Sequence, residues 1–244
     1  MPRKAPNYIS AAKIEATPVD FKWNKTISKK IFSEEVNDRL FEAVTKSSYK
    51  ASFAVGIAAM EWVVYRFSGH TNISDALNRI EAAWASAINL VYCRDLQFWL
   101  TDKASAAKDQ VGAPLEISLA LLYSMHHRYS TNNLDVSEAA CRQILLAQHV
   151  VPKAAKFDAW LSQALQKLAN TFPQQAEPDA ETYDWSREEI VPQEFFEPDF
   201  MYTKESARAA LRGFLATLNP GQNPYLRTAE EIKASGFTGT AYSL

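Results

Sequence analysis

Glycine and cysteine are scarce in this chain. Of its 244 residues, 7 are glycine and 2 are cysteine. Collagen-like and disulfide-stapled proteins need far more of one or the other, and glycine-rich phosphate loops and turn-dense β architectures also need more glycine. Cys93 and Cys141 lie far apart in apolar segments, so we expect two buried, reduced thiols. The hydrophobic content of 47% excludes a wholly disordered chain.

Long hydrophobic runs are also missing. The most apolar stretch, residues 51–67, contains Glu61 and Arg66 and is shorter than the roughly 20 apolar residues that span a bilayer. The first ten residues are basic, but the apolar run that a secretory signal needs does not follow them. We therefore expect a cytoplasmic protein that does not bind membranes.

Sequence motifs for several common chemistries are absent as well. We find no Walker A loop, GxGxxG, GxSxG, HExxH or EF-hand loop. The sequence also has no Cys/His cluster with zinc spacing and no Glu-x-x-His pair of the kind found in di-iron bundles. The sequence therefore predicts no metal and no cofactor.

Helical periodicity is what the sequence does contain. Apolar residues recur at steps of three and four in seven segments, namely 33–69, 74–91, 114–129, 139–151, 157–168, 203–218 and 228–236. Capping residues such as Ser33, Asp135 and Thr228 mark helix starts, and Ser47-Ser48 is the place for a break in the first segment. No strand-like alternation of apolar and polar residues is longer than a few residues. We predict an all-α fold, a single irregular bundle of about 6–8 helices.

Charge divides the chain into four regions. The net charge of −2 is the sum of +5 over residues 1–30, −1 over 31–172, −8 over 173–200 and +2 over 201–244. We predict an extended basic arm (1–30), a helical core (31–172), an acidic, aromatic-rich connecting segment (173–202) and C-terminal helices that pack on the core (203–244). We expect the connecting segment to lie along the surface of the body, because a solvated spacer rarely carries so many aromatic residues.

The acidic segment favours a binding protein without enzymatic activity. Aromatic anchors surrounded by carboxylates suit an interface with a basic protein, such as a toxin or a nucleic-acid-processing enzyme, that this chain would inhibit or neutralise as an immunity-type protein. The predicted partner-binding residues are Asp184, Trp185, Glu188, Glu189, Glu194, Phe195, Phe196 and Glu197. The same acidic charge argues against nucleic acid as the main partner. A simpler interpretation, which we prefer for the arm, is that its basic residues neutralise the acidic segment within the fold.

The alternative is an all-helical enzyme whose site is assembled from several helices. Its candidate residues are Glu61, His126, His127, Arg142 and His149, and the reaction would be a hydrolysis, a metal-dependent step or the RNA cleavage of the HEPN class, in which Arg and His have a spacing like that of Arg142 and His149. Each candidate also has a structural interpretation. Glu61 fits the outer face of a wide helix, the two adjacent histidines suit a helix end, and the Arg-x6-His spacing arises by chance in an amphipathic helix.

Overall fold

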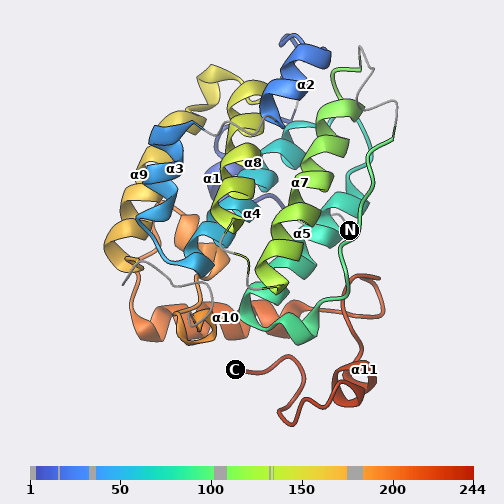
Figure 1. Ribbon diagram of the computed structural model, residues 1–244, viewed down its shortest axis with the longest axis vertical. Helices are drawn as coiled ribbons and strands as arrows, with labels where there is room; N and C mark the ends of the chain where they lie inside the picture. The colour runs from blue at the N-terminus through green and yellow to red at the C-terminus, as the bar shows by residue number, and fades with distance from the viewer. Residues whose placement is uncertain are drawn as a thin grey trace.

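The chain forms a bundle of α-helices (Figure 1). The computed structural model describes residues 4–15, 17–32, 37–101, 109–131, 133, 135–174 and 184–244. Within these residues there are ten α-helices and no β-strand, which confirms the predicted all-α bundle. The α-helices are α1 (Asn7–Ser10), α2 (Lys25–Ile31), α3 (Asp38–Thr45), α4 (Tyr49–Arg66), α5 (Ser74–Ile88), α7 (Gly112–Ser130), α8 (Val136–Val150), α9 (Phe157–Thr171), α10 (Lys204–Thr217) and α11 (Ala229–Ala234). Short 3-10 helices are η1 (Leu90–Tyr92), η2 (Lys153–Ala155), η3 (Trp185–Arg187) and η4 (Gln193–Phe196).

Helix α4 is the centre of the fold, and all 18 of its residues are buried. It packs against α5, α7 and α8, and more lightly against α3, α9 and η4. A helix covered on every side needs apolar or small residues on every face, which is what residues 51–64 supply apart from Glu61. Gly56 allows the closest approach, because a Cβ there would lie 2.2 Å from Sδ of Met125 in α7.

Capping side chains set several helix boundaries. The predicted break at Ser47-Ser48 is confirmed, since Ser48 ends the connection from α3 and its hydroxyl accepts a hydrogen bond from a backbone N–H in the first turn of α4. The predicted capping box at Thr228 is also present in α11. Asp135 precedes α8 as predicted, but its side chain makes no capping hydrogen bond. The predicted start at Ser33 lies outside the described residues.

The N-terminal region is less extended than predicted, because α1 and α2 interrupt it. Its chain is fixed to the core by Arg66, whose buried guanidinium donates to the carbonyl oxygens of Ile14 (3.3 Å), Thr17 (2.7 Å) and Pro18 (2.6 Å). These carbonyls lie outside the helices, so the guanidinium adds hydrogen bonds that helix formation does not supply. The arm is thus part of the folded body.

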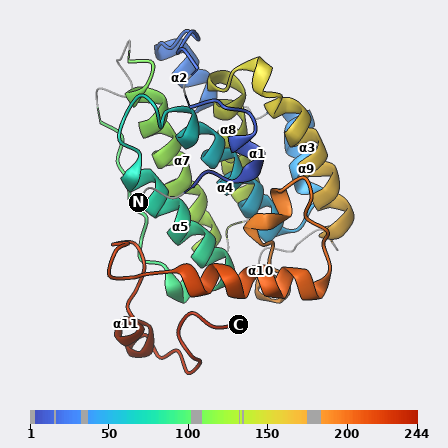
Figure 2. The same cartoon turned by 180° about the vertical axis from the view of Figure 1, so that it is seen from behind.

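The C-terminal helices cover one end of the bundle. Helix α10 runs across the axes of the other helices, and α11 and the last residues lie beyond it (Figure 2). This region is joined to the core through an isolated bridge between Cys93 and Leu226 and a hydrogen bond from the Tyr92 hydroxyl to the carbonyl of Ser243 (2.8 Å). Cys93 and Cys141 are both buried and free, as predicted.

Candidate functional site

Glu61 is buried, which corrects the expectation that it lies on an outer helix face. Its carboxyl group is 2% exposed and accepts hydrogen bonds from the Tyr8 hydroxyl, from Nε1 of Trp84 (3.2 Å) and from Nε2 of Gln193 (2.5 Å). These donors belong to α1, α5 and η4, of which α1 and η4 are distant from α4 in the sequence. Periodicity could not show this, because the partners that make burial of the carboxyl tolerable are supplied by other segments.

The surroundings of Glu61 indicate a structural role. Trp160 stacks on the ring of Tyr8 at 5.3 Å between ring centroids, and it also contacts Trp62 at 5.5 Å. Burial, together with the neighbouring Glu61 carboxyl, raises the pKa of the Tyr8 hydroxyl well above its ordinary value, so this hydroxyl remains a donor throughout the physiological range. The three donors join three segments of the chain to α4.

The two adjacent histidines point in different directions. His126 is buried in α7 beside the ring of Phe53, and no described residue lies within hydrogen-bond reach of its Nε2. Burial lowers its pKa to about 4 despite the nearby carboxylate of Asp95. His127 is exposed on the same turn and packs against the ring of Tyr123 at 6.0 Å.

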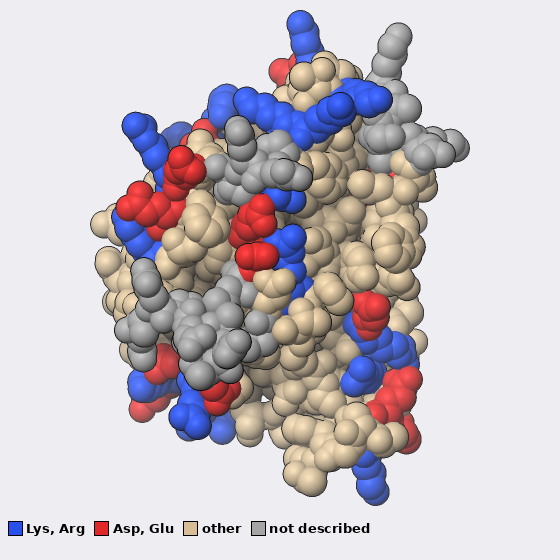
Figure 3. Space-filling view, in the orientation of Figure 1, with Lys and Arg blue, Asp and Glu red and all other residues tan. Residues whose placement is uncertain are grey.

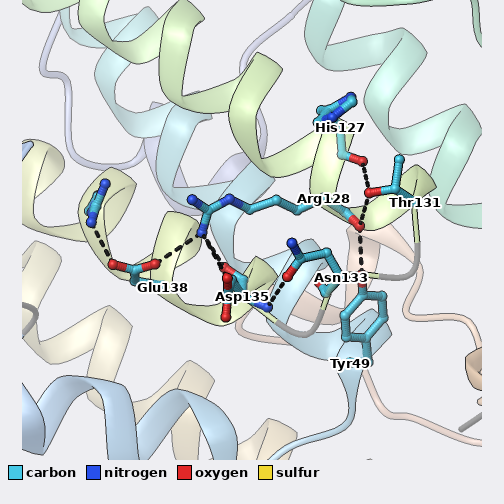
Figure 4. Close-up of polar contacts among 8 residues, drawn as sticks. Tyr49, His127, Arg128, Thr131, Asn133, Asp135 and Glu138 are labelled. Carbon is cyan, nitrogen blue, oxygen red and sulfur yellow. Dashed lines mark hydrogen bonds and ion pairs between the residues drawn. The ribbon is translucent and has the colours of Figure 1, made fainter. Parts of the chain in front are cut away.

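Arg142 belongs to an ion-pair cluster at the ends of α7 and α8. Its Nη2 donates to Glu138 (2.5 Å), whose other oxygen accepts from Arg128 (3.0 Å). Figure 4 shows Arg128 reaching toward both Glu138 and Asp135, the latter at 3.9 Å, while the Tyr49 hydroxyl donates to the carbonyls of Arg128 and Asn133. The cluster joins the short connection between α7 and α8 to the start of α4.

His149 lies about two helical turns from Arg142, a separation of roughly 10 Å. Its Nε2 contacts the carbonyl of Lys22 at 2.8 Å, and its ring packs against Phe21 and Trp23. Each of the two residues is therefore engaged with a different part of the chain. Among the described residues the five candidate catalytic side chains do not come together in one site.

The acidic segment differs most from expectation. Phe195 and Phe196, predicted as exposed anchors, are 1% and 4% exposed. Phe195 packs against Phe172 and Phe196 against Trp84 and Trp160, so both belong to the hydrophobic core. This part of the prediction is wrong because the aromatic side chains of the segment turn inward and cover the core.

Two carboxylates of the segment cap helices. Glu188 accepts hydrogen bonds from the backbone N–H groups of Tyr49 (3.0 Å) and Lys50 (2.7 Å) at the start of α4. Glu197 accepts from the backbone N–H groups of Asn7 (2.8 Å) and Tyr8 (3.1 Å) at the start of α1. Helix starts offer unpaired N–H groups and a positive dipole end, so a carboxylate there is stabilising even when it comes from a distant segment.

The remaining predicted interface residues are nearer the surface. Asp184 is exposed and pairs with Arg187 at 3.0 Å, and Glu189 is exposed and accepts from Tyr202 and pairs with Lys204 at 3.1 Å. Trp185 and Glu194 are half-buried, with the Trp185 ring packed against Tyr129 and Tyr49. Glu188 and Glu197 thus make contacts within the fold, whereas Asp184 and Glu189 lie at its surface.

An exposed aromatic cluster, which sequence reasoning missed, lies beside α7. Trp99 is 70% exposed, and its ring contacts Tyr123 edge-on at 5.9 Å, next to His127. Leu100 beside it is also exposed. We call Trp99, Leu100, Tyr123 and His127 the Trp99 face. In Figure 3, uncharged side chains cover the middle of the face that carries α7, and charged side chains border it above and below. The sequence signal was a tryptophan in a stretch without helical periodicity.

The described residues provide neither a metal site nor a membrane span. Across the described ranges, no group of three or more His, Cys, Asp or Glu side chains is placed to hold a metal ion. In the same part of the chain, every helix is too short or too polar to traverse a lipid bilayer.

Comparisons with protein-family models, with curated proteins and with solved structures gave no match.

Proposed function

We propose that this chain is a binding protein that recognises another protein through the Trp99 face. The observation that carries the proposal is the exposure of Trp99, whose ring contacts that of Tyr123. Interface centres are depleted in charge and enriched in Trp and Tyr, and these two residues are frequent energetic hot spots. A single exposed apolar residue without such neighbours would not indicate an interface, because isolated residues of this kind are common on protein surfaces.

The arrangement of the cluster suits recognition. Tyr123 and His127 are one helical turn apart on α7, a rigid element, so the contacts with Tyr123 hold the indole of Trp99 against a fixed support. A partner with an apolar pocket would accept the exposed part of the indole, and the hydroxyl of Tyr123 and the imidazole of His127 would supply hydrogen bonds at its edge.

The basic character first expected of the partner has less support. Among the predicted interface carboxylates, Glu188 and Glu197 cap helices, and Asp184 and Glu189 have basic partners within the chain. Each already has a favourable interaction that a partner would have to replace. The enzymatic alternative likewise has less support, because its candidate side chains are engaged in separate contacts.

Affinity capture with a matched pair of variants tests the proposal. Tagged wild-type chain, Trp99→Ser and Met201→Ser would be used to capture proteins from the native lysate, with quantification by mass spectrometry. Met201 is 82% exposed and lies outside the Trp99 face, so it controls for loss of a single apolar side chain. We expect a specific protein to be lost about thirtyfold with Trp99→Ser, which corresponds to about 2 kcal/mol, and retained with Met201→Ser.

Two results would refute the proposal. One is equal capture by wild type and Trp99→Ser, and the other is the absence of any protein above background. Sedimentation of the purified chain at several concentrations completes the test, since Trp99-dependent self-association would identify the partner as a second copy.

A further inference from the structure

A groove of about 1040 Å³, lined by both polar and apolar groups, lies apart from the Trp99 face. It forms where the end of α4 and the turn into α5 meet the beginning of the described chain and the residues that follow α10. In Figures 1 and 2 the N-terminal end, α5 and the loop after α10 lie together at one edge of the molecule. The volume is at the upper end of the range for sites that hold drug-sized molecules.

Side-chain amides contribute several of the polar groups in the walls of the groove. Asn72, Asn78, Asn219 and Gln222 all line it, and hydroxyl groups of Thr71 and Ser74 lie among them. An amide can both donate and accept, and a hydroxyl can do the same. The buried side chains of Ile73 and Leu77 add apolar surface to the lining.

Asn223 makes one wall rigid. Its side chain is 2% exposed, and its Nδ2 donates to the carbonyl of Asn78 (2.8 Å) and to Oε2 of Glu81 (2.9 Å). Its oxygen accepts from the backbone N–H of Tyr225 at 2.9 Å. The chain after α10 is therefore fixed to α5 by a buried amide whose NH2 group and oxygen both make hydrogen bonds. The groove is thus formed before a ligand binds.

Several side-chain amides of the groove have NH2 groups that are available to donate hydrogen bonds. Oδ1 of Asn72 accepts from the N–H of Ser74 (2.9 Å), and Oδ1 of Asn219 accepts from the N–H of Gly221 (3.0 Å). These bonds fix each amide oxygen toward the backbone and leave its NH2 group for a ligand. The side chains of Asn78 and Gln222 make no hydrogen bond to any described residue.

We propose that this groove binds a neutral saccharide of more than one ring. A saccharide presents hydroxyls that donate and accept around apolar C–H faces, which matches a lining of amides and hydroxyls together with the apolar side chains of Ile73 and Leu77. An anionic ligand fits less well, because Glu15 and Glu81 line the groove together with Lys4. A purely apolar ligand would bury the amides without partners, at a cost of roughly 1–3 kcal/mol for each group.

An array of neutral and acidic glycans, probed with the labelled full-length chain, tests the inference. The best neutral glycan would then be titrated as a free oligosaccharide by calorimetry, which separates recognition of the sugar from recognition of its attachment. Asn78→Leu and Gln222→Leu each remove a side-chain amide that has no hydrogen-bond partner among the described residues, at a half-buried and an exposed position respectively. Gln166→Leu, on the exposed surface of α9, is the matched control. Circular dichroism and urea unfolding would verify that each variant is folded.

We expect binding of at least one neutral glycan, a loss of tenfold or more in affinity with Asn78→Leu and with Gln222→Leu, and unchanged affinity with Gln166→Leu. The proposal is overturned if no neutral glycan binds at millimolar concentration, if acidic glycans bind in preference, or if both groove variants bind like wild type. Because the Trp99 face shares no residue with the groove, Trp99→Ser should leave glycan binding intact, and neither proposal depends on the other.

Discussion

The buried imidazole of His126 should make the stability of the fold depend on pH. In the folded chain the pKa of His126 is lowered from 6.5 to about 4, mainly because burial penalises the charged form. Unfolding returns the imidazole to water and to its ordinary pKa. Between these two pKa values the unfolded chain binds more protons than the folded chain, so the free energy of unfolding falls as the pH falls.

The size of the effect follows from the two pKa values. At pH 8 the imidazole is neutral in both the folded and the unfolded chain, so its ionisation does not change the free energy of unfolding. At pH 5 the contribution of His126 lowers the free energy of unfolding by about 2 kcal/mol, and below pH 4 the loss approaches about 3 kcal/mol.

Urea unfolding of wild type, His126→Gln and His127→Gln from pH 8 to pH 5 would measure this contribution. The difference between variants isolates one histidine, because the carboxylates titrate in all three proteins. We expect the free energy of unfolding of His126→Gln to fall by about 2 kcal/mol less than that of wild type over this range. His127→Gln, changed at the exposed neighbouring position, should follow wild type. Equal pH dependence in His126→Gln and wild type would show that the imidazole is not kept neutral by burial.

Two further predictions concern polar groups that join distant segments. Replacing Tyr8 with Phe removes one donor to the buried Glu61 carboxyl and should lower the free energy of unfolding by about 2 kcal/mol, whereas Tyr202→Phe, which removes an exposed contact to Glu189, should cost less than about 1 kcal/mol. Similar losses in thermal or urea unfolding would contradict the structural role of Glu61. Replacing Glu188 with Gln should cost about 1 kcal/mol through the weakened cap of α4, while Glu189→Gln stays within about 0.5 kcal/mol. If the two glutamate variants unfold alike, Glu188 is not acting as a cap.

The all-α fold class and most helix positions could be predicted from the sequence, because they depend on the local spacing of apolar residues. The break at Ser48 and the box at Thr228 each involve residues within one turn, so their sequence signals are sufficient. The position of Glu61 could not be predicted in this way. A carboxyl group within an apolar helix fits either an outer face or a paired interior, and the decision rests on Tyr8 and Gln193, which are 53 and 132 residues away.

The functional surfaces were harder still to predict. Composition identified the acidic segment correctly as unusual, but it could not tell an aromatic side chain that binds a partner from one that covers the protein's own core. Phe195 and Trp99 are both large and apolar, and only tertiary packing makes the first buried and the second exposed. The groove residues gave no signal either, because amides in turns are ordinary in sequence and gain meaning only when three segments place them together.

The basic arm and the acidic segment do meet, although not through their charges. Within the described residues, no lysine of the arm pairs with a carboxylate of residues 184–200. Backbone N–H groups of α1 instead donate to Glu197. Glu188 makes the equivalent contact with the start of α4. Both carboxylates therefore satisfy backbone donors that no helix can satisfy internally, a need that exists whatever the charge of the arm. Two residues of the acidic segment thus act as helix caps. Exposed aromatic or amide side chains that have no such structural role are better indicators of an interaction surface.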